Sequence, residues 1–573
     1  MKKKLLVLLK SPYKFNTNHF FLGRWCIPFK YENKKTINNC SNYHWNNEKK
    51  KKKDAIYLNK FYEKVLNKLS FKLNKIHNIN FSKKQWRLII GFWLMNFITK
   101  SFDSYENLNF FLKNNKKKFF VDFFSIKLES IISKDYSDYT LNYINHFTYN
   151  QYLYQDLISQ CFYNNFTINK TKSVKNNLGS LNINTHSKSS PLKLFIKKII
   201  NKLNLFQKKI FFEFDYIDPF FKRKLMWMLK IIPNYNFPFY NFKKTKISKN
   251  KRQFNLNILS KKKFENFVNR NAFKYIPYSY LENFKNIYND SLKINLNSKK
   301  IFSTGSYIAN DFFKIWLSTR MKKKAKFYIM YHGGGIPMYN HLSNHDEKIS
   351  NRVISWHKPM NNKQIQLLNL CLKNKLNNRK KSYILITLEP AYYYPVRFFA
   401  GNPVSSQFIQ DYEEKRKFAK KILMQGQKVK IRPHNGKVWD LKKRIEKNLG
   451  VGCYDNSLKL INSLENSKFH ISGYLSTTFS ESINVNIPTI GFINQKGQHY
   501  NHKFNDLIKL FYDNNLLFYD SKDLFKFIKK NDYDLDDWWN SKKIQDIVNI
   551  YKKDVLGTKC KTFNGWRKLL LKP

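Results

Sequence analysis

From Ile301 onward, short apolar runs alternate with segments of helical periodicity, and no other feature of the sequence constrains the fold as strongly. Helix-length stretches separate the strand-like runs IFSTG, KFYIM, SYILIT, KVKIR, KFHIS and IPTIGFI. Alternation at this spacing predicts parallel sheets with helices on both faces. Because the pattern is broken near residues 360–380, we expect an α/β protein with two Rossmann-like domains that face each other across a cleft.

The N-terminal half is expected to hold the first of these domains. The runs LLVLL and FFLGRW are strand-like, whereas residues 50–295 are dense in Lys, Asn, Phe and Tyr and show helical periodicity in places. The predicted first domain covers residues 1–370 and carries a large, mostly helical insertion over about 50–295. The second domain covers residues 371–545. Residues 546–573 are expected to form a C-terminal helix, with packing back on the first domain as one option.

The net charge is the next feature to interpret. Lys and Arg number 105 against 39 Asp and Glu, which gives a formal charge of +66. Such a charge favours a nucleic acid or an anionic membrane surface as a partner. However, the enriched residues are those that an AT-rich genome encodes, the basic residues are spread along the whole chain, and no RRM or KH signature is present. Nucleic acid is therefore the less favoured partner.

Cysteine spacing and hydropathy bear on the compartment and on metals. The six cysteines form no CxxC pair, which disfavours a disulfide framework or zinc knuckle and favours a reducing compartment. The longest apolar run, Leu88 to Ile98, is shorter than the ~20 residues of a membrane-spanning helix. His341 and His345 have the i,i+4 spacing of a metal-binding pair, but the segment HLSNH lacks the glutamate of the HExxH motif. We expect a cytoplasmic protein without a metal, or one peripheral at the inner membrane face.

The most informative segment is SGYLSTTFSES, which follows the strand-like run KFHIS. Gly473 permits a sharp turn, and three hydroxyl side chains then fall where a helix begins: Ser476, Thr477 and Thr478. Hydroxyls and unpaired backbone N–H groups at a helix N-terminus suit a phosphate or diphosphate. Glu481 is placed either to accept from ribose hydroxyls beside that phosphate or to complete a capping box begun at Thr478. Both interpretations stay open.

A second segment, YHGGGIP, follows the strand-like run KFYIM, so its residues fall at the carboxyl edge of a sheet. Its three glycines, which permit close approach of another group, are Gly333, Gly334 and Gly335. His332 titrates near neutrality and is a candidate general base or charge stabiliser. A simple glycine-rich turn is the alternative. The HGGG pattern is similar to a lipase oxyanion motif, but the GxSxG elbow is missing, which disfavours a serine hydrolase.

A third segment, KIRPHNG, also lies at a predicted strand end. Arg432 is suited to bind a diphosphate through two hydrogen bonds, and His434 to donate one more. Taken alone, the segment is equally well explained as a basic turn ended by Pro and Gly. The functional interpretation is stronger for the three segments taken together, because all fall on the same edge of predicted sheets and combine phosphate-binding groups with a base.

Several segments resemble a family of transferases found among bacterial surface-carbohydrate biosynthesis proteins, including those for O-antigen. They are FLGRWC, FSKKQWRLIIGFWLMNFI, YHGGG with NHDEKISNRVISWH, and GYLSTTFSESINVNIPTIGF, in this order along the chain. The resemblance implies a GT-B-like fold and transfer of a sugar or related group from a nucleotide-activated donor to a surface glycan or lipid-linked acceptor. Arg24 stands where the resemblance predicts the glutamate of FLGEWC, so no acid/base role is carried over to that position.

Carried over onto the matching positions, the resemblance makes His332 the base or charge stabiliser. The residues that it implies for the donor are Ser476, Thr477, Thr478 and Glu481. The leading hypothesis is a metal-independent glycosyltransferase that uses a nucleotide sugar as co-substrate and no other cofactor. Two alternatives are a basic nucleic-acid-binding protein and a transferase-like scaffold without activity in a glycan pathway.

Overall fold

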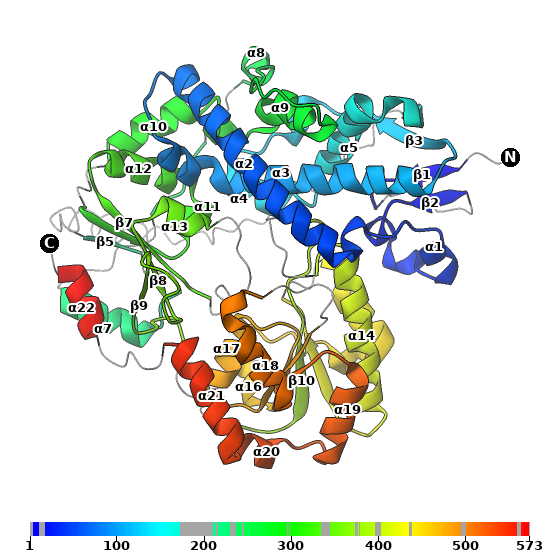
Figure 1. Cartoon of the computed structure of the whole chain (residues 1–573), viewed down its shortest axis with the longest axis vertical. Helices are drawn as coiled ribbons and strands as arrows, with labels where there is room; N and C mark the ends of the chain where they lie inside the picture. Colours follow the sequence, from blue (N-terminus) through cyan, green and yellow to red (C-terminus); the bar gives the residue numbers. More distant parts are fainter. Residues whose placement is uncertain are drawn as a thin grey trace, which may run out of the picture.

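The computed structural model describes three parallel β-sheets with flanking helices (Figure 1). In Figure 1 the first sheet lies on the right, the second on the left and the third at the bottom. The residues that the structure describes are 4–10, 18–171, 210–213, 216–229, 237–242, 246–294, 296, 298–333, 344–372, 376, 379–395, 403–434, 438–493, 500–557 and 563–571. The α/β class with parallel sheets, predicted from the alternation of strands and helices, is confirmed.

The first sheet has the strand order β2-β1-β3-β4, with every pair parallel. Its strands are β1 (Leu5–Val7), β2 (His19–Phe21), β3 (Phe119–Phe124) and β4 (Phe166–Thr171). The helices of this part are α1 (Lys34–Asn38), α2 (Glu48–His77), α3 (Lys83–Asn114), α4 (Tyr136–Asp138) and α5 (Phe147–Cys161). Because β3 pairs with β1 and β4 pairs with β3, the stretch over 50–295 is not simply a helical insertion: it supplies half of a sheet.

Helix α3 explains the long apolar run of the sequence. Its N-terminus is closed by a capping box, in which Ser82 Oγ accepts from the Gln85 N–H at 3.3 Å and Gln85 Oε1 accepts from the Ser82 N–H at 2.8 Å. The run from Leu88 to Ile98 is buried on all sides by protein. Among the described residues, no helix combines the length and the apolar character needed to cross a bilayer.

The second sheet has the order β5-β6-β7-β8-β9 and is also parallel throughout. Its strands are β5 (Ile210–Phe212), β6 (Lys300–Ser303), β7 (Lys326–Met330), β8 (Arg352–Ser355) and β9 (Gln364–Gln366). The helices before and between them are α7 (Pro219–Leu229), α8 (Lys249–Arg252), α9 (Lys263–Tyr275), α10 (Phe284–Leu292), α11 (Ser306–Ala309), α12 (Asp311–Lys322) and α13 (His345–Ile349). The stretch between β6 and β7 forms two helices divided at Asn310, which caps α12 by accepting from the Phe313 N–H at 3.2 Å.

The third sheet has the order β11-β10-β12-β13-β14. Its strands are β10 (Tyr383–Thr387), β11 (Val429–Arg432), β12 (Ser467–Ser472), β13 (Thr489–Phe492) and β14 (Leu517–Phe518). Its helices are α14 (Ser406–Leu423), α15 (Leu441–Leu449), α16 (Leu460–Glu465), α17 (Thr477–Asn484), α18 (Asn505–Asp513), α19 (Ser521–Lys530) and α20 (Asp536–Asn540). The break predicted near 360–380 falls between β9 and β10, where the chain passes from the second sheet to the third.

The last two helices run back from the third sheet to the second. Helix α21 (Lys542–Asp554) packs on α17, and Tyr551 Oη lies 2.8 Å from Ser480 Oγ. Helix α22 (Asn564–Leu571) lies beside α7 and the second sheet (Figure 1). There Lys300 Nζ donates to the Leu569 carbonyl at 2.9 Å, and the Trp566 indole packs against Phe212. The C-terminal segment thus contacts both of these sheets.

Residues that follow the carboxyl ends of strands in the three sheets contact one another. Lys10, after β1, pairs with Asp440, after β11, with 2.8 Å between Nζ and Oδ2. The backbone N–H of Arg24, after β2, donates to Ser406 Oγ at the start of α14 at 3.2 Å. Residues after β7 and β12 also meet, as described below. Ligands of parallel α/β sheets bind outside this strand end, so the meeting point is where a site is expected.

Candidate functional site

Gly473 follows the buried strand β12 at a point where no side chain fits. Its backbone N–H donates to the Thr387 carbonyl of the neighbouring strand β10 at 2.8 Å. A Cβ at Gly473 would lie 2.7 Å from that carbonyl oxygen and 2.9 Å from Cε of Lys415. Glycine is therefore required by the close approach of two backbones, whereas the sequence predicted only that Gly473 permits a sharp turn.

Helix α17 begins at Thr477, with Ser476 as its N-cap. The Ser476 side chain makes no capping hydrogen bond. Thr478 is therefore inside the helix and Glu481 is its fifth residue, in the second turn, so the predicted capping box between Thr478 and Glu481 is wrong. The Ser476, Thr477 and Thr478 side chains are half-buried at the helix start.

His332 follows β7 and is held in one orientation. Its ring stacks on Tyr216 with 4.5 Å between ring centroids, and Nδ1 lies 2.8 Å from the Thr304 carbonyl oxygen. A carbonyl only accepts, so Nδ1 carries the proton of the neutral imidazole and the lone pair is on Nε2. In this tautomer Nε2 is the ring nitrogen that can accept a proton.

Glu213, directly after β5, is a buried carboxylate that the sequence analysis missed. It organises the turn after β6 by accepting from backbone N–H groups and hydroxyls. These donors are the N–H groups of Thr304 (3.1 Å), Gly305 (3.4 Å) and Ser306 (3.0 Å) and the hydroxyls of Ser303 and Ser306. Because the same turn presents the Thr304 carbonyl to His332, Glu213 positions the imidazole indirectly. An acidic residue immediately after an apolar strand is the signal that could have identified it.

The loops of His332 and of helix α17 approach each other closely. A Cβ at Gly333 would lie 2.9 Å from Oγ1 of Thr477. The second and third sheets therefore bring the residue next to His332 against the first residue of the hydroxyl-bearing helix. Gly334 and Gly335, also predicted to permit close approach, lie outside the described residues.

Arg432, at the end of β11, is engaged within its own sheet. Its Nη1 donates to Asp455 Oδ2 at 2.9 Å, to the Ser457 carbonyl at 2.8 Å and to Ser463 Oγ at 3.2 Å. His434 is exposed two residues further on. Arg432 thus anchors the loop after η10 (Val451–Cys453), and its predicted role towards a diphosphate remains a prediction.

A cluster of buried charges lies behind the Gly473 turn, and the sequence analysis missed it too. Glu389, two residues beyond β10, is fully buried, and neither of its carboxylate oxygens has a hydrogen-bond partner among the described residues. Burial and the nearby Asp411 carboxylate raise the pKa of Glu389 well above its usual range. Asp411 pairs with Lys415, and burial lowers the pKa of Lys51 to about 8. Like Glu213, Glu389 is an acidic residue close behind a buried strand.

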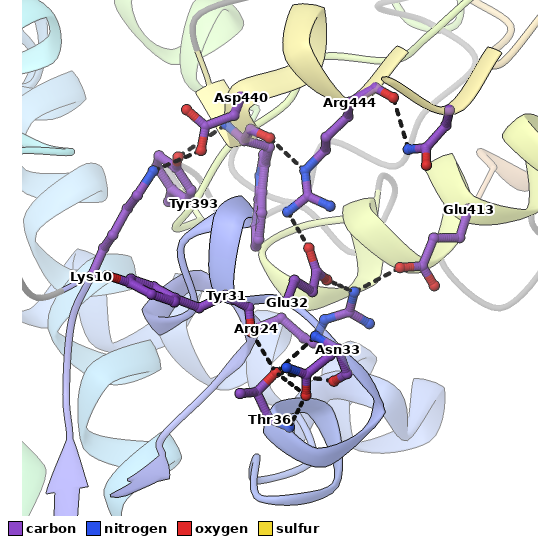
Figure 2. A network of polar contacts seen from close by, with 12 residues as sticks. Lys10, Arg24, Tyr31, Glu32, Asn33, Thr36, Tyr393, Glu413, Asp440 and Arg444 are labelled. Atoms are coloured by element: carbon purple, nitrogen blue, oxygen red, sulfur yellow. Dashed lines mark hydrogen bonds and ion pairs between the residues drawn. The ribbon is translucent and has the colours of Figure 1, made fainter. Parts of the chain in front are cut away.

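Arg24, which replaces the expected glutamate, belongs to an ion-pair network that joins the first and third sheets (Figure 2). Its guanidinium pairs with Glu32 and, at 2.6 Å, with Glu413 of α14. Arg444 of α15 pairs with the other oxygen of Glu32 at 2.5 Å. Two cations and two carboxylates therefore alternate, and the positive charge at position 24 is compensated by the two glutamates that surround it.

The fold and the positions of these loops define an α/β protein with its polar loops gathered at the carboxyl ends of parallel strands. Within that class the chain belongs to the LIC12162 family transferases, whose family model matches residues 4–571. No curated protein and no solved structure matches the chain. The expectation of a transferase family is therefore confirmed over nearly the whole chain.

Proposed function

We propose that this transferase moves a sugar or related group from a nucleotide-activated donor to a cell-surface polysaccharide such as O-antigen. The observation that carries the proposal is the contact between the Gly333 loop and the first residue of α17. It brings a candidate base and a candidate phosphate site together from two sheets. In this proposal the second and third sheets act as the two halves of a GT-B-like enzyme.

The donor phosphate or diphosphate lies at the N-terminus of α17, where the backbone N–H groups and the helix dipole favour an anion. The Ser476 hydroxyl supports this proposal, because it makes no capping bond to its own helix. Glu481 accepts from the ribose hydroxyls. Arg432 and His434 lie at the end of β11 on the same edge of the third sheet and add donors there.

His332 is the proposed base. The acceptor hydroxyl gives its proton to Nε2 as its oxygen bonds to the anomeric carbon, and the bond from that carbon to the donor phosphate breaks with its electron pair on the phosphate. The helix N-terminus then stabilises the charge on the leaving group, so this step needs no metal at the α17 site. The acceptor is a glycan or a lipid-linked glycan. A cytoplasmic enzyme bound peripherally to an anionic membrane face would suit the high positive charge.

A thermal-shift measurement on the full chain tests donor binding. We expect one of CMP, CDP, UDP or GDP to raise Tm and Glu481→Ala to abolish the rise, because the ribose contact is lost. Glu414→Ala, which removes an exposed carboxylate of α14, is the matched control and should respond like the wild type. If none of the four nucleotides shifts Tm of the wild type, the donor site is not where we place it.

A turnover assay with a panel of nucleotide sugars separates an enzyme from an inactive scaffold. Removing the base with His332→Gln should lower kcat by about 10²–10⁴-fold, while the nucleotide-induced rise in Tm stays as in the wild type. An unchanged kcat would remove His332 from the mechanism. Absence of turnover with every donor, despite nucleotide binding, would favour the scaffold.

A further inference from the structure

Three side chains from the N-terminal part of the chain form a group with metal-ligand character. They are His44 in the turn η3 (His44–Asn46), Asp54 on α2 and Glu106 on α3. One ligand atom from each lies within 4.8 Å of the other two. We propose that this group is a site for a divalent transition-metal ion, with Zn²⁺ as the best chemical match.

His44 is the first ligand, and its surroundings leave one nitrogen for a metal. The side chain is fully buried, and Nε2 lies 3.1 Å from Asp103 Oδ1. A carboxylate accepts, so Nε2 carries the proton and Nδ1 carries the lone pair. Nδ1 has no hydrogen-bond partner among the described residues. A buried nitrogen without a partner costs free energy, which a metal bond at Nδ1 would remove.

Asp103 completes the arrangement expected around a metal-bound histidine. Its Oδ1 also accepts from the Tyr43 hydroxyl at 2.6 Å, so the carboxylate itself is held in place. A carboxylate that accepts from the far nitrogen of a ligating histidine fixes the tautomer and makes the other nitrogen a better ligand. His44 of η3 and Asp103 of α3 are both buried, so water does not compete for the hydrogen bond between them.

The two carboxylates already attract a cation from the chain itself. Lys50 Nζ lies 2.5 Å from Asp54 Oδ2 and 2.8 Å from Glu106 Oε2. The Lys50 side chain is 31% exposed and the two carboxylates 14% each, so the ammonium approaches from the solvent side. Lys50 can turn outward and leave its position open to an incoming ion. It therefore acts as a competitor for the site rather than as a ligand.

The types of the three ligand atoms indicate which ion would bind. One imidazole nitrogen and two carboxylate oxygens suit Zn²⁺, at about 2.0–2.2 Å from each atom, with a remaining position for water. The three ligand atoms, which lie within 4.8 Å of one another, would have to move closer together to bind the same ion. Displacement of the Lys50 ammonium from between the carboxylates would make room for this movement. The site joins η3, α2 and α3, and it shares no residue with the proposed base and donor-binding group. Its role is structural, and it does not depend on the proposed function.

Zinc binding by the full chain, purified without a histidine tag, tests the proposal. We expect about one bound zinc per chain by atomic emission after dialysis, and competition with a chromophoric chelator should give the affinity. Lys50→Met should tighten binding tenfold or more, because it removes the competing ammonium without touching a ligand. Lys53→Met changes an exposed lysine of the same helix and should bind like the wild type.

His44→Gln and Glu106→Gln should each weaken zinc binding at least 100-fold. Cobalt(II) supplies a second readout, because its visible absorption becomes stronger and shifts when nitrogen and oxygen ligands of the protein replace its bound water in a four-coordinate site. Far-UV circular dichroism tests whether each variant is folded. If His44→Gln does not fold, the comparison rests on Glu106→Gln. The proposal is overturned if wild type and Lys50→Met bind no more zinc than Glu106→Gln.

Discussion

Single residues at the ends of strands make up most of the candidate site of this protein. Glu213, His332, Glu389 and Gly473 each lie within three residues of a strand end. At Gly473 the requirement is steric, because the backbone approaches Thr387 too closely for any side chain. The position of one backbone carbonyl thus decides whether the turn before helix α17 can form.

Replacement of this glycine should therefore affect both stability and binding. We expect Gly473→Ala to lower the free energy of unfolding by about 1–3 kcal/mol, since the added methyl group overpacks against a backbone oxygen. Nucleotide-induced stabilisation should be lost with it. Urea denaturation and thermal shift measure the two effects. Gly452→Ala, where a Cβ meets open space, should leave both unchanged; an equal effect would refute the steric argument.

Elements far apart in the sequence are held together by ion pairs as well as by apolar packing. The network of Arg24, Glu32, Glu413 and Arg444 ties the loop after β2 to α14 and α15 (Figure 2). The Arg24 side chain is only 10% exposed. Its loss would leave Glu413 unpaired and Glu32 with one cation, and partly buried charges without partners are costly.

Arg24→Met should accordingly destabilise the protein by about 2–3 kcal/mol, because it keeps the apolar stem and removes only the charge. The free energy of unfolding in urea is the measurement. Lys417→Met, also on α14, removes an exposed partner of Glu414 and should cost less than about 0.5 kcal/mol. Equal losses from the two variants would mean that the network adds nothing beyond a surface ion pair.

Across the whole molecule, one continuous apolar core joins described residues of all three sheets, from Leu6 to Leu556. Three histidines are buried in neutral form within it. Burial lowers the pKa of His77 and of His357 to about 4 and that of His470 to about 3. The unfolded chain, whose histidines titrate near 6.5, therefore binds more protons than the folded chain between about pH 6.5 and 4.

Stability should consequently fall as pH is lowered through this interval and be fully present above pH 6.5. Each of His77 and His357 contributes roughly 3 kcal/mol to the loss, at 1.36 kcal/mol per pKa unit. Urea denaturation at pH 7.5 and 4.5 measures the difference. His357→Gln should reduce it, and His502→Gln, at an exposed position, should not. A His357→Gln protein with the wild-type pH dependence would contradict the assignment.

Much of the second and third sheets follows from the sequence alone. IFSTG, KFYIM, SYILIT, KVKIR, KFHIS and IPTIGFI are strands β6, β7, β10, β11, β12 and β13, because a buried parallel strand is a local apolar run that needs no distant information. The turn at Gly473, the helix after it and the place of His332 at a strand end follow from the same local patterns. The membership in a transferase family also lies in the sequence.

Only the tertiary structure decided which of these segments touch. The runs LLVLL and FFLGRW overlap β1 and β2, but β3 and β4 were missed. Strand β3 is recognisable as the partner of β1 only when chain more than 100 residues away is placed beside it, and β4 only as the partner of β3. The approach of Gly333 to Thr477, the glutamates around Arg24 and the group of His44, Asp54 and Glu106 likewise join distant segments. Local periodicity fixes what an element is and which face is apolar. It contains no information on which distant charge or backbone will lie against that element.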